Sequence, residues 1–296
     1  MKLAAIDVGS NAARLQISKV TLGQDGQERF KKLEYIRYPL RLGKDVFSEG
    51  KISPKRRANF VKLMRAFALV IDLHEVDEVI AYATSATREA ENGEEIAKEI
   101  RLMTGLPLEV IDGEREARVT FEALSEFIDD GAYIHIDVGG GSTELNLHQG
   151  GEKIAGKSFP VGSVRSLAEK DDDVWTDMRR WINDFVPTGE EVLAVGTGGN
   201  INKLSQLIDG SRDGYLIDLF RLEDKRQELA EFTTEERMSV FNLNPDRADV
   251  IVPASEIYLN AMRSAGADKI LVPRVGLKDG MLRYLYKKKR NVPEMA

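Results

Sequence analysis

A five-residue pattern occurs twice in the chain, and its spacing constrains the fold more than any other feature. Ile6-Asp7-Val8-Gly9-Ser10 near the start returns as Ile136-Asp137-Val138-Gly139-Gly140. The two aspartates lie 130 residues apart (137 − 7), which is about the length of one domain. Each copy is an apolar run that ends in Asp and Gly, which is typical of a buried strand entering a tight turn. We therefore expect two similar domains, each presenting an Asp and a glycine turn at a strand end.

Strand and helix patterns alternate along the rest of the chain. A helix is expected to begin at Ser53-Pro54, because Ser caps orphan backbone N–H groups and Pro tolerates the first helical position. Further helices are expected over 94–104 and from Asp112 onward. Strands are predicted over 14–20, 33–38, 78–84, 108–111, 133–138, 144–147 and 192–194. This alternation predicts the α/β class.

Composition excludes several kinds of protein. The 296 residues contain no cysteine, which rules out disulfides, thiolate metal sites and a cysteine nucleophile. The three histidines are too scattered for a zinc site, and His135, inside an apolar strand, is expected to be structural. No run of about 18 apolar residues occurs, and Asp7 interrupts any leader, so we expect a cytoplasmic protein with no membrane partner.

The charge also bears on the ligand. A formal net charge of −7 argues against nucleic-acid binding but allows a small polyanion in a locally positive site. The basic run 287–290 could attract a long polyanion, although cations at the C-terminal end of a helix are the more common explanation.

Three glycine-rich turns follow apolar strands and predict phosphate binding. They are 9–11, 139–143 and 196–200, and such turns let several backbone N–H groups approach one anion. One such turn is weak evidence, but three in similar positions are not easily explained by chance. Magnesium needs only a few carboxylates besides water and phosphate oxygens. Asp137 with Glu144 is the expected pair, and Asp7 is a further candidate.

Seven segments together make the chain resemble the exopolyphosphatase/guanosine pentaphosphate phosphohydrolase family, within the acetate and sugar kinase, Hsp70 and actin superfamily. They read AAIDVGSNAARLQI, YATSATREAENG, IDGEREARVTF, IDVGGGSTEL, AVGTGGNINKL, RADVIVPA and VGLKDGMLRYL, in family order from residue 4 to residue 285. The resemblance implies two ribonuclease-H-like (actin-like ATPase) domains with mixed sheets flanked by helices. It places the active site in the interdomain cleft and returns a C-terminal helix, from about Asp279, to the first domain. The expected domains are 1–120 plus 281–296, and 121–280.

The resemblance also assigns roles to residues. Glu116 would position or deprotonate the attacking water, and Arg88 would face the phosphates and steady developing charge. Glu114 is a rival that spacing alone does not exclude. The implied phosphate-binding residues are Ser10, Asn11, Arg14, Gly139, Gly140, Gly141, Ser142, Thr143, Gly198, Gly199, Asn200 and Lys203. For Arg14 and Lys203, an ordinary surface role is an equal alternative.

The expected function is release of terminal phosphate from inorganic polyphosphate, with Mg²⁺ or alternatively Mn²⁺. Guanosine pentaphosphate (pppGpp) is a close alternative substrate. A small-molecule kinase and a non-catalytic nucleotide or alarmone sensor are alternative functions. Two departures from the family matter: Ala12 and Ala13 replace a hydroxyl position of the first loop, and the C-terminal helical domains of long members are lacking. We therefore expect short chains as substrate and leave homodimer formation open. Specificity loops are expected at 42–51 and 209–215.

Overall fold

The computed structural model describes residues 1–167, 172–187, 189–209 and 216–290. It divides into two compact units: Met1–Ala123 with the segment that starts at Gly276, and Leu124–Val275. The sequence prediction placed these divisions after residues 120 and 280. None of the helices in the described part of the chain is both long and apolar enough to cross a bilayer.

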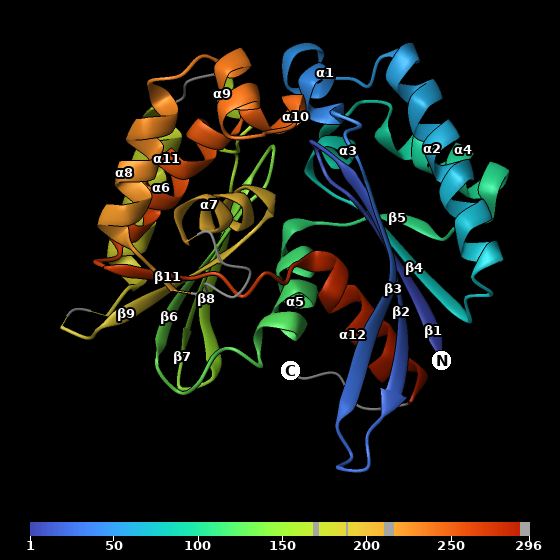
Figure 1. Cartoon of the computed structure of the whole chain (residues 1–296), viewed down its shortest axis with the longest axis horizontal. Coiled ribbons are helices and arrows are strands. Elements are labelled where there is room, and N and C mark those ends of the chain that lie inside the picture. The colour runs from blue at the N-terminus through green and yellow to red at the C-terminus, as the bar shows by residue number, and fades with distance from the viewer. Residues whose placement is uncertain (168–171, 188, 210–215, 291–296) are drawn as a thin grey trace. The chain divides into compact units, whose positions relative to one another are not determined.

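The first unit is built on a mixed sheet in the order β3-β2-β1-β4-β5 (Figure 1). Its strands are β1 (Lys2–Val8), β2 (Ala13–Leu22), β3 (Glu28–Tyr38), β4 (Glu78–Ala83) and β5 (Leu108–Val110). Its helices are α1 (Leu42–Glu49), α2 (Pro54–Leu73), α3 (Ser85–Glu89), α4 (Gly93–Thr104), α5 (Gly113–Leu124) and α12 (Leu277–Lys289). β1 runs antiparallel to β2 and parallel to β4.

Both faces of this sheet are covered, as the apolar composition of β1 requires. Leu3, Ala4, Ala5 and Ile6 are fully buried, although successive side chains of a strand point to opposite faces. Leu3 and Ala5 belong to a cluster that includes Met281 and Leu282 of α12. The C-terminal helix therefore packs on the sheet of the first unit, far from it in sequence.

The second unit has a mixed sheet in the order β10-β11-β9-β6-β7-β8. Its strands are β6 (Ala132–Val138), β7 (Thr143–Gln149), β8 (Glu152–Phe159), β9 (Val192–Thr197), β10 (Leu216–Asp218) and β11 (Lys269–Leu271). Its helices are α6 (Asp172–Phe185), α7 (Gly199–Asp209), α8 (Leu219–Ala230), α9 (Thr234–Val240), α10 (Pro245–Ala248) and α11 (Ile251–Ser264), and η1 (Arg165–Leu167) is a short 3₁₀ turn. One core joins this sheet to α6, α7, α8 and α11.

The two mixed sheets flanked by helices confirm the predicted α/β class and the two-domain organisation. The predicted cap is present as well: the Ser53 hydroxyl accepts from the Arg56 backbone N–H, and Pro54 is the first residue of α2. The expected helix from Asp112 begins at Gly113, and Asp112 caps it by accepting from the Arg115 N–H at 2.7 Å.

One prediction of local structure is wrong. Residues 42–51 were expected to be an exposed specificity loop, but most of them form α1, in which Leu42, Val46 and Phe47 are buried. Leu42, Val46 and Phe47 recur at helical spacing, and packing of this stripe orders the segment. The other expected loop, 209–215, lies almost wholly outside the described residues.

The basic run at the end of α12 is held by carboxylates of its own unit. Lys287 pairs with Glu122, Lys289 with Glu78, and Arg290 lies 3.8 Å from Glu28. These pairs tie the end of the helix to the unit, which favours the helix-end explanation over a polyanion site.

Candidate functional site

The first predicted loop closes a hairpin between β1 and β2. The Gly9 N–H donates to the Ala12 carbonyl at 3.1 Å, and Asp7 stands directly opposite Arg14 in the strand register. Arg14 Nη1 lies 2.7 Å from Asp7 Oδ2, so the two charges compensate each other. Direct metal binding by Asp7 would therefore compete with its arginine partner.

The start of α1 also binds this loop through backbone hydrogen bonds. The Arg41 N–H donates to the Asn11 carbonyl and the Gly43 N–H to the Ser10 carbonyl, both at 2.8 Å. Arg41 has a φ of 55°, a left-handed conformation that is uncommon for a residue with a side chain. The segment that sequence reasoning assigned to a loop therefore helps to fix the backbone of the predicted phosphate-binding residues.

Glu116 and Arg88 are close neighbours in the first unit. Arg88, near the end of α3, donates from Nη1 to the Ile111 carbonyl at 2.8 Å, and the same nitrogen lies 3.8 Å from Glu116 Oε2. The side chain of Arg88 is 26% exposed and that of Glu116 is 16% exposed. A carboxylate and a guanidinium are thus held together where α3 meets the start of α5.

Burial distinguishes Glu116 from its rival in the same helical turn. Glu114 is exposed to solvent. Arg115, between them, is turned toward the sheet, where it donates to the Tyr82 hydroxyl at 2.9 Å and pairs with Glu109. This geometry supports the choice of Glu116 over Glu114.

The second loop repeats the geometry of the first. The Gly139 N–H donates to the Ser142 carbonyl at 2.9 Å, and Asp137 stands opposite Glu144 as Asp7 stands opposite Arg14. The hydroxyl of the fully buried Thr143 donates to the Val161 carbonyl at 2.6 Å. Thr143 therefore ties the loop to its surroundings, and we do not propose it as a direct phosphate ligand.

A segment that sequence reasoning missed clamps this loop. The N–H groups of Ser163 and Val164 donate to the Gly139 and Gly140 carbonyls at 3.0 and 2.8 Å, and Arg165 Nε donates to the Gly141 carbonyl at 2.7 Å. A Cβ on Gly162 would stand 2.6 Å from the Gly140 and Gly141 backbone. The Gly-Ser pair at 162–163 was the available signal, but the carbonyls that the clamp binds lie 24 residues away in sequence.

Asp137 and Glu144 are suitable magnesium ligands. They are directly opposed on neighbouring antiparallel strands, so their side chains share one face of the sheet. Glu144 Oε1 accepts from the Ser142 and Ser158 hydroxyls at 2.7 and 2.9 Å, which orients the carboxylate. Among the described residues no larger acidic or histidine cluster could hold a metal by itself. Two carboxylates suffice for Mg²⁺ when water and phosphate supply the remaining oxygens.

The third loop lies between β9 and α7. Gly198 has a φ of 111°, which favours glycine, and Gly199 and Asn200 begin the helix, with Asn200 buried. Burial and the nearby Arg247 lower the pKa of Lys203. Arg247, in α10, donates to the Gly199 carbonyl and is a second cation at this loop that sequence reasoning missed.

The predicted residues therefore form two groups. The first loop, Asp7, Arg88 and Glu116 belong to the first unit, whereas the second and third loops, Asp137, Glu144 and Lys203 belong to the second.

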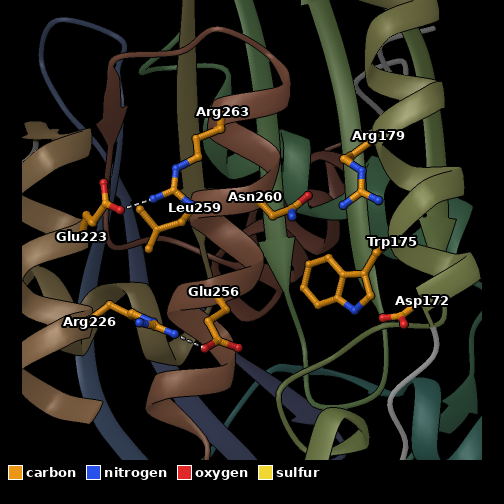
Figure 2. Close-up of a pocket in the computed structure, with 9 residues that line it drawn as sticks. All are labelled: Asp172, Trp175, Arg179, Glu223, Arg226, Glu256, Leu259, Asn260 and Arg263. Atoms are coloured by element: carbon orange, nitrogen blue, oxygen red, sulfur yellow. Dashed lines mark hydrogen bonds and ion pairs between the residues drawn. The ribbon is translucent and has the colours of Figure 1, made fainter. Parts of the chain in front are cut away.

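A separate open pocket of about 470 Å³ in the second unit contains none of the predicted residues among its described lining (Figure 2). Arg226 and Arg263 in this pocket are paired with Glu256 and Glu223, which ties α8 to α11. Two of the three arginines in the described lining are thus paired with carboxylates, which makes the pocket a weaker candidate for the phosphate site.

Comparison with known proteins identifies the family. The model of the Ppx/GppA phosphatase family matches residues 20–289. The chain belongs to this family. Membership in the Ppx/GppA family confirms the resemblance and identifies the chain as a phosphohydrolase.

Relatives and solved structures cover nearly the whole chain. Exopolyphosphatase 2 of Mycobacterium tuberculosis is 29% identical over 95% of this chain and 97% of its own length. Exopolyphosphatase 1 of the same organism is 26% identical over 95% and 87%. A crystal structure of an Aquifex aeolicus Ppx/GppA member aligns over 98% of both chains with a TM-score of 0.78 and 25% identity. An exopolyphosphatase from Cytophaga hutchinsonii aligns over 100% of both chains with a TM-score of 0.82 and 24% identity, which supports the fold.

Proposed function

We propose that this protein is an exopolyphosphatase, which hydrolyses the terminal phosphoanhydride bond of inorganic polyphosphate. The observation that carries the proposal is the Glu116–Arg88 pair: a half-buried carboxylate beside a guanidinium, in a chain with glycine turns suited to phosphate. The similar proteins named exopolyphosphatase span nearly its whole length. Guanosine pentaphosphate is the less favoured substrate, and no observation in the structure favours a kinase or a sensor.

The mechanism follows from the charges of the reaction. Phosphoryl transfer needs an in-line water and compensation of charge on the phosphate oxygens rather than covalent chemistry. Glu116 orients the water and accepts its proton, and Arg88 donates hydrogen bonds to oxygens of the terminal phosphate. The water oxygen bonds to phosphorus as the bridging P–O bond breaks, which gives orthophosphate and a shortened chain.

Backbone N–H groups of the three loops hold the phosphates, with Lys203 and Arg247 as nearby cations. Asp137 and Glu144 would hold Mg²⁺, or Mn²⁺, which would neutralise phosphate charge when bound. The Glu116 group and the Asp137 group lie in different units, and the proposal requires that both act on one substrate. The expected cleft, the cytoplasmic location, the homodimer and the preference for short chains stay predictions.

The test is phosphate release by the purified protein with Mg²⁺ from tripolyphosphate, long-chain polyphosphate, guanosine pentaphosphate and ATP at equal concentration of terminal phosphate. We expect the highest kcat/KM with an inorganic chain. A higher kcat/KM with guanosine pentaphosphate would show that this compound, and not polyphosphate, is the preferred substrate. Binding without release from any of them would overturn the hydrolase proposal and point to a sensor, and transfer of phosphate to an acceptor would indicate a kinase.

A further inference from the structure

A group of buried polar side chains lies at the start of the third loop, around Thr197. His135 of β6, Thr197 at the end of β9 and Tyr258 of α11 are 1%, 0% and 0% exposed. All three belong to the second unit, and none of them was assigned a role in phosphate binding. Buried polar groups are costly unless they are hydrogen-bonded, so their partners indicate what the cluster does.

His135 connects the second hairpin to the third loop. Its Nε2 lies 2.8 Å from Thr197 Oγ1, and its Nδ1 lies 3.4 Å from the Asn146 side-chain nitrogen on β7. The imidazole is 1% exposed and has a hydrogen-bonding neighbour at each ring nitrogen, so it holds β6, β7 and the end of β9 together.

Tyr258 binds Thr197 as well, through the backbone. Its hydroxyl donates to the Thr197 carbonyl, the last one before Gly198. Burial and the neighbouring Asp137 carboxylate raise the pKa of Tyr258 well above its ordinary value, so the hydroxyl keeps its proton. A Cβ on Gly198 would stand 3.0 Å from this hydroxyl and 3.4 Å from Asp137 Oδ1, which shows how closely the loop packs here.

Thr197 is therefore fixed through both its side chain and its backbone, directly before Gly198, Gly199 and Asn200 of the third loop.

We propose that His135, Thr197 and Tyr258 are positioning residues for phosphate binding, which hold the N–H groups at 198–200 in the orientation that the substrate needs. The proposal rests on the function proposed above, since it concerns the same loop. These side chains contact no substrate, and they act only through the loop backbone. Their loss should weaken binding and leave the chemical step largely intact.

The experiment compares three isosteric or conservative variants. Tyr258→Phe removes only the hydroxyl. Thr197→Val replaces the hydrogen-bonding Oγ1 by a methyl group, whereas Thr197→Ser keeps that oxygen. Tyr133→Phe is the matched control, because Tyr133 lies at the other end of β6 and its hydroxyl bonds to Asp129 instead. Tripolyphosphate binding is measured by calorimetry, steady-state kinetics give KM and kcat, and hydrogen exchange is followed at the amides of 198–200.

Loss of one hydrogen bond corresponds to about a fivefold change in an equilibrium. We expect Tyr258→Phe and Thr197→Val to raise Kd and KM by about five- to tenfold with kcat within about threefold, and to speed amide exchange at 198–200. Thr197→Ser and Tyr133→Phe should behave like the wild type. A purely structural role would lower the melting temperature in Tyr258→Phe and Thr197→Val without this split between KM and kcat.

Unchanged Kd, KM and exchange in both hydroxyl-deleting variants would overturn the proposal, as would an equal effect in Tyr133→Phe. Failure of the wild type to hydrolyse any phosphoanhydride would instead overturn the proposed function. In that case binding and amide exchange still decide whether these side chains hold the loop.

Discussion

Glu116 and Glu114 lie two residues apart at the start of α5, yet the helix gives them different surroundings. Glu116 is 16% exposed and lies 3.8 Å from Arg88, whereas Glu114 is exposed. A general base must be held within reach of its water and beside the group that receives the charge. Of the two, only Glu116 has a cation placed beside it.

Replacing Glu116 by Gln should lower kcat by about 10²-fold or more, because the amide keeps the shape but cannot accept the proton. Binding of tripolyphosphate, measured by calorimetry, should change little. Glu114→Gln serves as the control and should keep at least half of the wild-type kcat. Near wild-type turnover by Glu116→Gln would remove this residue from the role of base.

The carboxylate pair of the second hairpin leads to a prediction about the metal. Asp137→Asn should raise the Mg²⁺ concentration for half-maximal activity by at least about tenfold, since a neutral amide is a weaker ligand for a hard cation. The measurement is a Mg²⁺ titration after removal of bound metal with a chelator. The exposed Asp130 provides the control through Asp130→Asn. An unchanged titration curve for Asp137→Asn would place the metal elsewhere.

At the scale of structural elements, the segment 162–165 fixes the backbone of the second loop through hydrogen bonds. It leaves no room for a side chain at Gly162, whose Cβ would stand 2.6 Å from backbone atoms of Gly140 and Gly141. Backbone atoms cannot rotate away as the end of a long side chain can. Any side chain at 162 must therefore displace the loop or the clamp.

We expect Gly162→Ala to destabilise the protein by about 1–3 kcal/mol, the usual range for overpacking, and to raise KM for polyphosphate by at least about tenfold. Urea unfolding and steady-state kinetics measure the two effects. Gly276→Ala is a suitable control, because a Cβ there meets no atom within 4 Å and its φ is not positive. Equal kinetic effects in the two variants would show that the clamp does not shape the loop.

Local patterns in the sequence predicted most elements, because alternation and capping depend on neighbouring residues. They predicted the strands that carry Asp7 and Asp137, the start of α2 at Ser53-Pro54, and the three glycine turns. The clamp at 162–165 and the contact of Arg247 with Gly199 could not be predicted, since both join segments that only tertiary packing brings together. Helix α1 was missed because a pattern of eight residues is weak evidence for a helix, and tertiary packing determines whether so short a segment is helical.

At the scale of the molecule, the histidines are unequally distributed. His135 and His148 are buried in the second unit, whereas His74 belongs to the first. Burial is the main cause that lowers the pKa of His135 to about 3 and of His148 to about 4, against an ordinary value of 6.5. In the unfolded chain both histidines take up protons near the ordinary value, but the folded unit does not.

The unfolded state therefore binds more protons below pH 6.5, so stability falls as the pH is lowered from there toward 4 and 3. We expect the second unit to melt at a lower temperature at pH 5 than at pH 7, with a smaller change in the first unit. Calorimetry combined with hydrogen exchange of each unit measures this. His148→Gln should reduce the pH dependence, because the amide does not titrate. An equal loss in both units would assign the acid sensitivity to other groups.

The matched hairpins carry one further consequence. Asp7 faces Arg14 in the first copy, and Asp137 faces Glu144 in the second, at the same place in an otherwise equivalent turn. With Arg at this position the carboxylate of the first hairpin is paired with a cation, and with Glu we expect the second hairpin to attract a cation instead. In electrostatic terms the first turn presents a balanced ion pair, whereas the second presents two adjacent carboxylate positions.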